Sequence, residues 1–184
     1  MNILVVGGAG YIGSHMVKLL GRRGCHVTTL DDLSSGHRDT VLAGDFIQGD
    51  MADAALLRNV FATRPYDAVM DFASFIEVGE SVREPAKYYR NNVANTLTLL
   101  AAMREAGVDR FIFSSTAAIF GTPQYVPIDE RHPRAPINPY GRTKNMVEDV
   151  LADYAQAYGL CSVCLRYFNA AGADPDGELG ERHD

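Results

Sequence analysis

Apolar residues follow two alternating patterns along this chain: short continuous runs, and longer stretches in which they recur at helical spacing. Continuous runs are typical of strands buried on both faces, and they occupy residues 2–7, 25–31, 45–50, 66–73, 110–115 and 161–169. The helical pattern lies between them, at about 11–24, 53–64, 84–106 and 140–158. Five prolines between residues 123 and 139 predict an irregular loop before the last helix.

This alternation predicts a parallel sheet with helices on both faces, the doubly wound α/β class. We expect one Rossmann-like domain over residues 1–184. Ligands of such sheets bind beyond the carboxyl ends of the strands, near the point where the strand order reverses. The motifs described below fall at strand ends or at the starts of the helices that follow.

Composition narrows the class of protein further. The 184 residues are 47% hydrophobic and 22% charged, which is typical of a globular domain. A net charge of −6 argues against a nucleic-acid partner, which favours a basic surface. No apolar run is long enough to cross a membrane, and we expect neither a signal peptide nor a membrane anchor. Three cysteines, an odd number, fit a reducing compartment. We therefore expect a cytoplasmic protein without membrane or nucleic-acid partners.

Cys161 and Cys164 have the spacing of a redox or zinc motif but lie in a predicted buried strand. Side chains three apart on a strand point to opposite faces. We interpret both cysteines as core residues, and we predict no metal site.

The first strand-to-helix turn carries the glycine pattern Gly7, Gly10 and Gly13. Glycines allow a tight turn and a close approach of the backbone to a pyrophosphate, which the free N–H groups of the helix start can bind. An acidic pair, Asp31 and Asp32, ends the second strand, where a carboxylate can accept hydrogen bonds from the adenosine ribose. No arginine stands immediately beside the pair, so the pattern favours NAD over NADP.

Asp50 ends the third predicted strand, where it could meet the adenine. Aspartates are common in loops, so a purely structural role is an equal alternative for this residue.

Tyr140 and Lys144 lie four residues apart at the start of the last helix, and hence on one helical face. A tyrosine acting as a base near neutral pH needs its phenolate stabilised by about 4 kcal/mol, and a neighbouring ammonium can lower its pKa. Thr116 follows a strand end and could hydrogen-bond the reacting oxygen. Together the three residues would suit oxidation of a secondary alcohol beside a nicotinamide. The structural alternatives are a partly buried aromatic side chain and a capping hydroxyl.

Several stretches together resemble the extended short-chain dehydrogenase/reductase superfamily, in its NAD-dependent epimerase/dehydratase family, and within it the UDP-glucose 4-epimerases. They are "GGAGYIGSH", "VGES", "NNVANTLTLL", "FIFSSTAAIFG", "NPYGRTK" and "LRYFNAAGA". The resemblance implies that a UDP-sugar is oxidised transiently at C4, rotates as the 4-keto sugar, and is reduced on its opposite face. It also implies a possible homodimer through two helices, here at about 84–106 and 140–158.

The resemblance assigns roles residue by residue. Tyr140 would be the base, Lys144 would hold the nicotinamide ribose and tune Tyr140, and Thr116 would assist. The remaining matched positions would contact the cofactor or the sugar nucleotide: Tyr11 and Ile12 at the pyrophosphate, Phe72, Ala73 and Asn91 near NAD, Phe168 at the nicotinamide, and Asn169 at the substrate.

Two sister activities are disfavoured. Dehydratases and decarboxylases of the family carry an acidic residue just after the strand-end hydroxyl, whereas this chain has Ala117 and Ala118. Another nucleotide-sugar epimerase is an alternative within the enzymes. A non-catalytic NAD-binding module or redox-sensing regulator is an alternative outside them. The presence of both Tyr140 and Lys144 argues against that alternative, and the shortness of the chain argues for it.

The chain departs from the family pattern in two ways. Asp71 stands where histidine is usual, and Ser74 where alanine or glycine is usual. We expect Asp71 to lie near the cofactor phosphates or ribose, and either to weaken NAD binding or to titrate with a raised pKa. The second departure is length, since the family's C-terminal substrate domain is largely missing. The chain could be a fragment, a truncated gene product or a natural short form, and we expect a NAD-binding half-enzyme.

Overall fold

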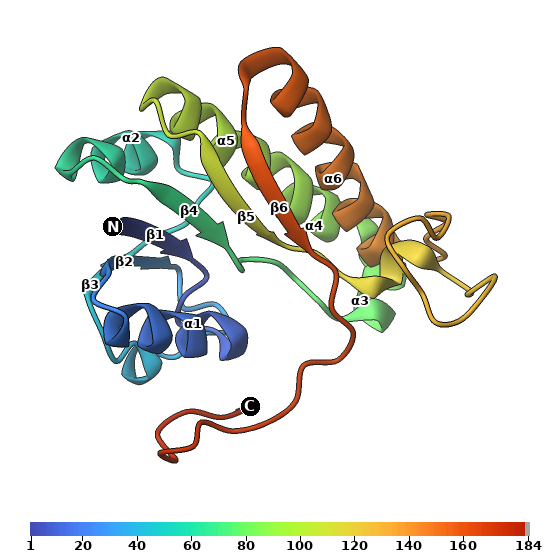
Figure 1. The fold of residues 1–184 in the computed structure, drawn as a ribbon, viewed down its shortest axis with the longest axis horizontal. Coiled ribbons are helices and arrows are strands. Elements are labelled where there is room, and N and C mark those ends of the chain that lie inside the picture. Colours follow the sequence, from blue (N-terminus) through green and yellow to red (C-terminus); the bar gives the residue numbers. More distant parts are fainter. Residues whose placement is uncertain (183–184) are drawn as a thin grey trace.

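The computed structural model describes residues 1–182 and contains six parallel strands in one sheet, in the order β3-β2-β1-β4-β5-β6 (Figure 1). The strands are β1 (Asn2–Val6), β2 (His26–Asp31), β3 (Asp45–Gln48), β4 (Ala68–Asp71), β5 (Arg110–Ser114) and β6 (Cys161–Leu165). The sequence therefore predicted every strand of the sheet, although some predicted strands were longer than the observed ones, by up to four residues at one end. The Rossmann-like doubly wound fold is confirmed.

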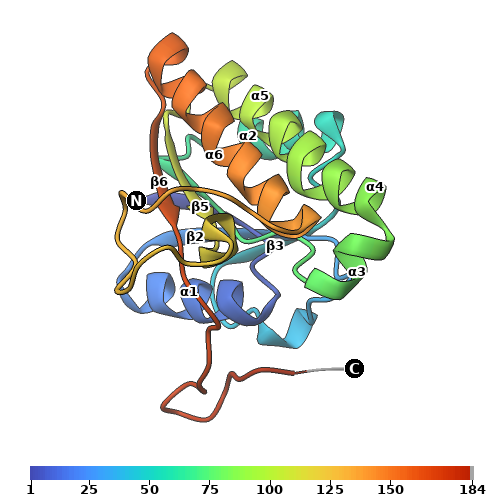
Figure 2. The same cartoon turned by 90° about the vertical axis from the view of Figure 1, so that its right-hand side faces the viewer.

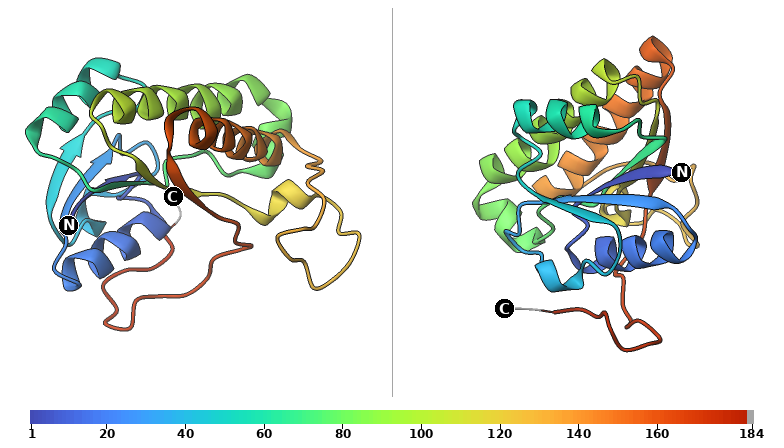
Figure 3. Two further views of the ribbon diagram at one scale, coloured as in Figure 1. Left: turned by 45° about the horizontal axis from the view of Figure 1, so that its top comes forward. Right: turned by 90° about the vertical axis from the view of Figure 1, so that its left-hand side faces the viewer.

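Helices cover both faces of the sheet (Figures 2 and 3). The helix α1 (Tyr11–Arg22) lies on one face, and α2 (Ala54–Thr63), α5 (Thr96–Glu105) and α6 (Pro139–Tyr158) lie on the other. Alternate residues of each central strand enter the two cores. Val5 packs with Val17 of α1, whereas Leu4 belongs to the core formed with α2, α5 and α6. Burial on both sides explains the continuous apolar runs of the sequence.

The long helix expected at 84–106 is a succession of shorter helical segments. These are α4 (Pro85–Tyr88), a π-helical segment η2 (Tyr89–Asn95) and α5, and a short helix α3 (Val78–Arg83) precedes them. Asn92, in the π-helical segment, is 1% exposed. Its side-chain amide binds the backbone N–H and carbonyl oxygen of Phe75 at 3.0 Å each. The segment therefore anchors the loop after β4, which is consistent with the common presence of π-helical turns at functional sites.

One prediction about the sheet was wrong. Residues 161–169 were expected to form a buried strand, but β6 ends at Leu165 and none of its residues is fully buried. It pairs with β5 alone and is thus an edge strand within the described residues. Cys161 is exposed and Cys164 half-buried, so Cys161 does not fill the core.

The chain after β6 returns to the opposite side of the molecule and lies beside α1 (Figure 1). The Tyr11 hydroxyl donates to the carbonyl oxygen of Gly172 at 2.6 Å. Lys18 of α1 binds the carboxylates of Asp174, Asp176 and Glu178. We call Lys18 with these three carboxylates the clasp. It ties the C-terminal segment to the helix that follows the glycine turn.

None of the helices formed by residues 1–182 has the length and apolar character that crossing a membrane requires.

Candidate cofactor-binding and active site

The strand order reverses between β1 and β4, because β1 leads to β2 on one side while β4 pairs with β1 on the other. Gly7 follows β1 at this point, with a φ of 75°. A Cβ atom there would lie 2.5 Å from the backbone nitrogen of Ala73, which follows β4. Only glycine therefore allows the two strand ends to approach this closely. The approach forms the floor of a pocket at the switch point.

The first turn of α1 opens into this region. Gly10 is its N-cap and offers no side chain, so the N–H groups of the first turn have no side-chain cap. A helix start with free N–H groups and its positive dipole end is suited to bind an anion such as a pyrophosphate. Tyr11, Ile12 and Gly13 make up this turn, as the sequence predicted.

The two aspartates at the end of β2 have different surroundings. Asp31 is 8% exposed and accepts hydrogen bonds from the backbone N–H groups of Ala9 at 2.9 Å and Leu33 at 2.8 Å. Burial raises the pKa of its carboxyl, the two N–H donors oppose this, and the charge of Asp32 adds to it. Asp32 is exposed and accepts from the N–H of Ser34 at 2.8 Å. Each carboxylate oxygen keeps a further lone pair for a hydroxyl group.

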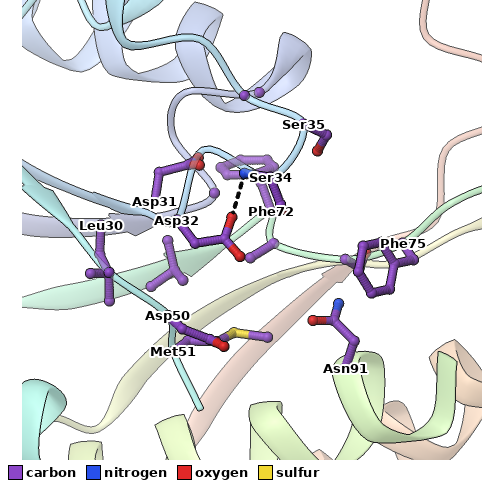
Figure 4. Close-up of a pocket in the computed structure, with 17 residues that line it drawn as sticks. Leu30, Asp31, Asp32, Ser34, Ser35, Asp50, Met51, Phe72, Phe75 and Asn91 are labelled. Carbon is purple, nitrogen blue, oxygen red and sulfur yellow. Dashed lines mark hydrogen bonds between the residues drawn. The ribbon is translucent and has the colours of Figure 1, made fainter. Parts of the chain in front are cut away.

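Most of the predicted cofactor residues line one pocket (Figure 4). Asp32 and Ser34, joined by their hydrogen bond, border it on one side, and Phe75 and Asn91 on the other. The predicted residues among its lining are Gly7, Gly10, Asp31, Asp32, Asp50, Phe72, Ala73 and Asn91. The sequence did not assign Ser34, Ser35, Met51, Ser74 or Phe75 to it.

The predicted catalytic residues Thr116, Tyr140 and Lys144 lie at or beside the start of α6. The Asn138 side chain caps this helix by accepting from the Gly141 N–H at 2.8 Å. A Cβ atom at Gly141 would lie 2.7 Å from the carbonyl oxygen of Ala118. Glycine therefore lets α6 pack against the short 3₁₀ helix η3 (Ala117–Phe120), which Thr116 caps. This packing brings Tyr140 and Thr116 together.

The electrostatics of Tyr140 differ from the expectation. Burial raises the pKa of its phenol, and interaction with the Thr116 side chain lowers it in part. Lys144 was expected to lower this pKa, but its ammonium is engaged elsewhere: it donates to the Ser74 hydroxyl at 2.6 Å and to the Ser114 carbonyl oxygen at 2.7 Å. Lys144 is 2% exposed, and burial lowers its pKa to about 8.

Asp71 is not among the residues that line the pocket. It is 1% exposed at the end of β4 and accepts from the Ala73 N–H at 3.0 Å. Its expected position near the cofactor phosphates or ribose stays a prediction. The expectation of a raised pKa is met, because burial raises the pKa of Asp71 to about 6, against the opposing charge of Lys144.

Phe168 and Asn169 lie on the segment after β6 and outside the pocket lining. Phe168 is 69% exposed. Phe168 follows Tyr167, whose carbonyl oxygen accepts from the N–H of Ala117, the neighbour of Thr116, at 3.0 Å. The contacts of Phe168 and Asn169 with cofactor and substrate remain predictions.

Two contributors to the site escaped a functional assignment from sequence. Ser74 was noted only as a departure, yet it lines the pocket and binds the ammonium of Lys144. Asn92 holds the loop after β4 and also donates to Thr143, the neighbour of Lys144, at 3.2 Å. Asn92 could have been noticed as a polar residue on the apolar face of a predicted helix. A buried amide usually has hydrogen-bond partners, so such a position indicates that the side chain holds another segment.

Comparison with known proteins adds three findings. The model of the NAD dependent epimerase/dehydratase family matches residues 3–183. UDP-glucose 4-epimerase of Rhizobium leguminosarum bv. trifolii is 54% identical over 182 residues, which are 99% of this chain and 56% of that protein. The crystal structure of UDP-glucose 4-epimerase from Brucella ovis in complex with NAD is also 54% identical, with a TM-score of 0.97 over 99% of this chain and 56% of that one.

A more distant match is the enzyme of the same name from Bifidobacterium longum, solved in complex with NAD⁺ and UDP. It is 39% identical, with a TM-score of 0.94 over 98% of this chain and 57% of that one. This chain therefore spans a little more than half the length of the relatives that it matches.

Proposed function

The chain belongs to the NAD dependent epimerase/dehydratase family, and on that basis we propose that it is the NAD-binding part of a UDP-sugar 4-epimerase, acting on UDP-glucose and UDP-galactose. The observation that carries the proposal is the contact between Lys144 and Ser74. It joins the cofactor pocket, which Ser74 lines, to the cluster of Thr116, Tyr140 and Lys144. A hydroxyl of a ligand in the pocket would thus meet a phenol and an ammonium.

The residues present fit NAD. The close approach at Gly7 leaves a backbone floor that a Cβ would fill, and the first turn of α1 offers uncapped N–H groups to a pyrophosphate. Asp31 and Asp32 retain acceptor capacity for ribose hydroxyls and would repel a 2′-phosphate. When bound, NAD supplies an acceptor for the hydride of the sugar carbon and returns it.

The chain's own residues have separate tasks. Tyr140 takes the proton of the sugar C4 hydroxyl at its phenolic oxygen and returns it after the keto sugar has rotated. Thr116 donates a hydrogen bond to the same substrate oxygen. Lys144 holds a ribose hydroxyl. In the structure its ammonium binds Ser74 and Ser114 and does not lower the raised pKa of Tyr140, so its effect on the phenolate is proposed for the complex with cofactor and sugar.

The remaining assignments follow from the relatives' greater length. We propose that residues 1–184 form the NAD-binding domain and that a substrate domain beyond them completes the sugar pocket, with Asn169 and Phe168 brought to it. A homodimer through the helices at 84–106 and 140–158 is part of the same proposal. A non-catalytic NAD-binding module is the second candidate, and the observation that favours it is the raised pKa of Tyr140, which Lys144 does not lower while its ammonium binds Ser74 and Ser114.

Release of bound nucleotide followed by a sugar challenge tests this. The purified chain is denatured, and the supernatant is assayed by mass for NAD; we expect NAD in both the wild type and Tyr140→Phe, because Tyr140 does not hold the cofactor. UDP-glucose is then added to the native proteins, and NADH is followed by absorbance. We expect NADH from the wild type alone.

The possible failures are distinct. A wild-type chain that neither carries nor binds NAD contradicts the cofactor assignment. A chain that binds NAD but forms no NADH with UDP-sugars, even when joined to the remaining part of the Rhizobium leguminosarum relative, supports the module instead. Equal NADH formation by Tyr140→Phe overturns the role of Tyr140.

A further inference from the structure

The ammonium of Lys144 is buried among neutral groups. Its direct hydrogen-bond acceptors are the Ser74 hydroxyl and the Ser114 carbonyl oxygen, and it lies 4.7 Å from the centroid of the Phe113 ring. These contacts orient the charge, and the aromatic face adds a modest attraction. A buried lysine with no adjacent counter-charge tends to lose its proton, because desolvation disfavours the charged form.

Asp71 is a buried acidic residue whose hydrogen bonding is also incomplete. One carboxylate oxygen accepts from Ala73, whereas Oδ2 is buried without a hydrogen-bond partner among residues 1–182. Thr96 faces it from α5, but its hydroxyl donates to the Asn92 carbonyl oxygen at 3.0 Å. An incompletely bonded carboxylate in the interior is costly unless a positive charge compensates it. The compensating charge at this site is that of Lys144, whose ammonium lies over the ring of Phe113, the residue opposite Asp71 in the register of β4 and β5.

We propose that Asp71 is a positioning residue for Lys144: its carboxylate keeps Lys144 in the ammonium form, while Ser74 and Ser114 hold that ammonium in place. The significance of the charge rests on the proposed function, in which Lys144 must stay cationic beside Tyr140 and the ribose. The two departures from the family pattern, Asp71 and Ser74, then serve the same lysine.

The mutual effects of the two charges agree with this assignment. Burial lowers the pKa of Lys144 to about 8, and the charge of Asp71 opposes the decrease. Burial raises the pKa of Asp71 to about 6, and the charge of Lys144 opposes the increase. No direct salt bridge joins the two groups within residues 1–182, so they act through the interior, where charges are screened less than in water. Both groups are ionised between about pH 6 and pH 8.

The other groups facing the pair do not change charge in this interval. Tyr140 from α6 and Tyr167 from the segment after β6 both have raised pKa values, chiefly through burial. The α5 helix contributes the uncharged Thr96. The strands on either side place Val6 and Phe113 opposite Asp71 in the sheet register. Asp71 is therefore the neighbouring carboxylate that sets the charge of Lys144 in this region.

Direct titration of the lysine side chains tests the proposal without relying on turnover. The sequence contains three lysines, Lys18, Lys87 and Lys144. In a chain labelled with ¹³C-lysine they give three Cε resonances, and Lys144→Arg identifies that of Lys144. We expect Asp71→Asn to move the Lys144 midpoint to lower pH, by on the order of one pH unit, and to leave Lys18 and Lys87 unchanged. Asp71→Glu, which keeps the charge, should retain most of the wild-type midpoint.

The matched control is Asp153→Asn, which removes the same charge from an exposed position on α6. It should leave the Lys144 midpoint in place. An unchanged midpoint in folded Asp71→Asn overturns the proposal. Should that variant not fold, the wild type decides: the Lys144 resonance should show a second inflection near pH 6 as Asp71 titrates, and its absence contradicts the assignment. NAD titration of the same samples reports separately on the proposed function.

Discussion

Two buried lysines on opposite faces of the sheet show how surroundings decide what a charge can do. Lys18 is 7% exposed and Lys144 is 2% exposed. Burial lowers the pKa of both, yet hydrogen bonds from Lys18 to Asp174, Glu178 and Asp176 outweigh it and raise the Lys18 pKa above its ordinary value. Lys144 contacts neutral oxygens, has one carboxylate acting through space, and has a pKa of about 8.

Under the proposed function, this difference separates a structural charge, Lys18, from a functional one, Lys144. In the clasp, two of the three carboxylates are about half exposed and remain hydrated, so the lysine is fixed as a cation. At the candidate site the Lys144 ammonium and Asp71 are both enclosed, and the charge of each compensates the burial of the other only in part. A lysine with a pKa near 8 can respond to a ligand, whereas one held by three carboxylates cannot.

The largest expected effect concerns the pH dependence of stability. The folded-state pKa of Asp71 is about 6, against an ordinary value of 3.8. Between these values the folded chain binds more protons than the unfolded chain, so the contribution of Asp71 to the free energy of unfolding falls as pH rises from about 4 to about 6. The stability of Asp71→Asn relative to wild type should increase over this interval, by roughly 3 kcal/mol at most. Urea denaturation at several pH values measures it.

Asp174→Asn should show the opposite dependence of stability on pH. The pKa of Asp174 is lowered, principally by its hydrogen bond to Lys18, so its contribution to stability is present above its ordinary pKa and is lost as pH falls through the folded value. The wild type should thus lose its higher free energy of unfolding over Asp174→Asn as the pH falls. Over the same range, the destabilisation that ionised Asp71 causes in the wild type should disappear. Parallel pH profiles for the two variants would contradict the distinction between the two regions.

The next largest effect concerns NAD affinity, which should depend on Lys144 but not on Lys18. Lys144→Met removes the charge next to the pocket but keeps much of the side-chain volume, and we expect NAD affinity to fall about thirtyfold, as for the loss of a charged hydrogen bond. Lys18→Met also removes a buried charge, that of the clasp, and should leave NAD affinity within about twofold. Isothermal titration calorimetry at neutral pH measures both. A loss of affinity in Lys18→Met as large as that in Lys144→Met would show that the clasp shapes the pocket.

The sequence was sufficient for the fold because strand burial on two faces is visible as continuous apolar runs, and because the glycine turn requires specific backbone geometry at Gly7. It also placed Asp31 and Asp32 at the pocket, since parallel strands end at the same edge. Asn91 was assigned only through the family resemblance, and it lines the same pocket. The edge position of β6 was not predicted, because Cys161 and Val163 have the residue types of a buried strand although both are exposed.

The contacts and charges of individual side chains were harder to predict from the sequence than the fold. Helical spacing predicted that Lys144 shares a face with Tyr140, but not that its ammonium binds Ser74 and Ser114 from other elements. Likewise, the sequence flagged Asp71 as unusual without showing that it faces Lys144 and Thr96. Such contacts depend on the packing of α5 and α6 on β4 and β5, which local patterns do not specify.

The smallest expected effect is that of salt, which should weaken the clasp but not the pair of Asp71 and Lys144. Asp176 and Glu178 have side chains 47% and 55% exposed, and at about 1 M NaCl charges separated by more than about 3 Å are screened in water. The amide N–H groups of Asp176 and Glu178 donate to Asp174, so their hydrogen exchange should become about threefold faster at this salt concentration.

The Val108 N–H, which donates to the Met103 carbonyl oxygen within the α5 region, is the internal reference and should not respond. The Lys144 midpoint should stay within about 0.2 pH units of its low-salt value, because buried pairs are screened far less than exposed ones. A Lys144 midpoint that falls with salt while the clasp amides stay protected would reverse the comparison, since the enclosed pair would then be the one open to solvent ions.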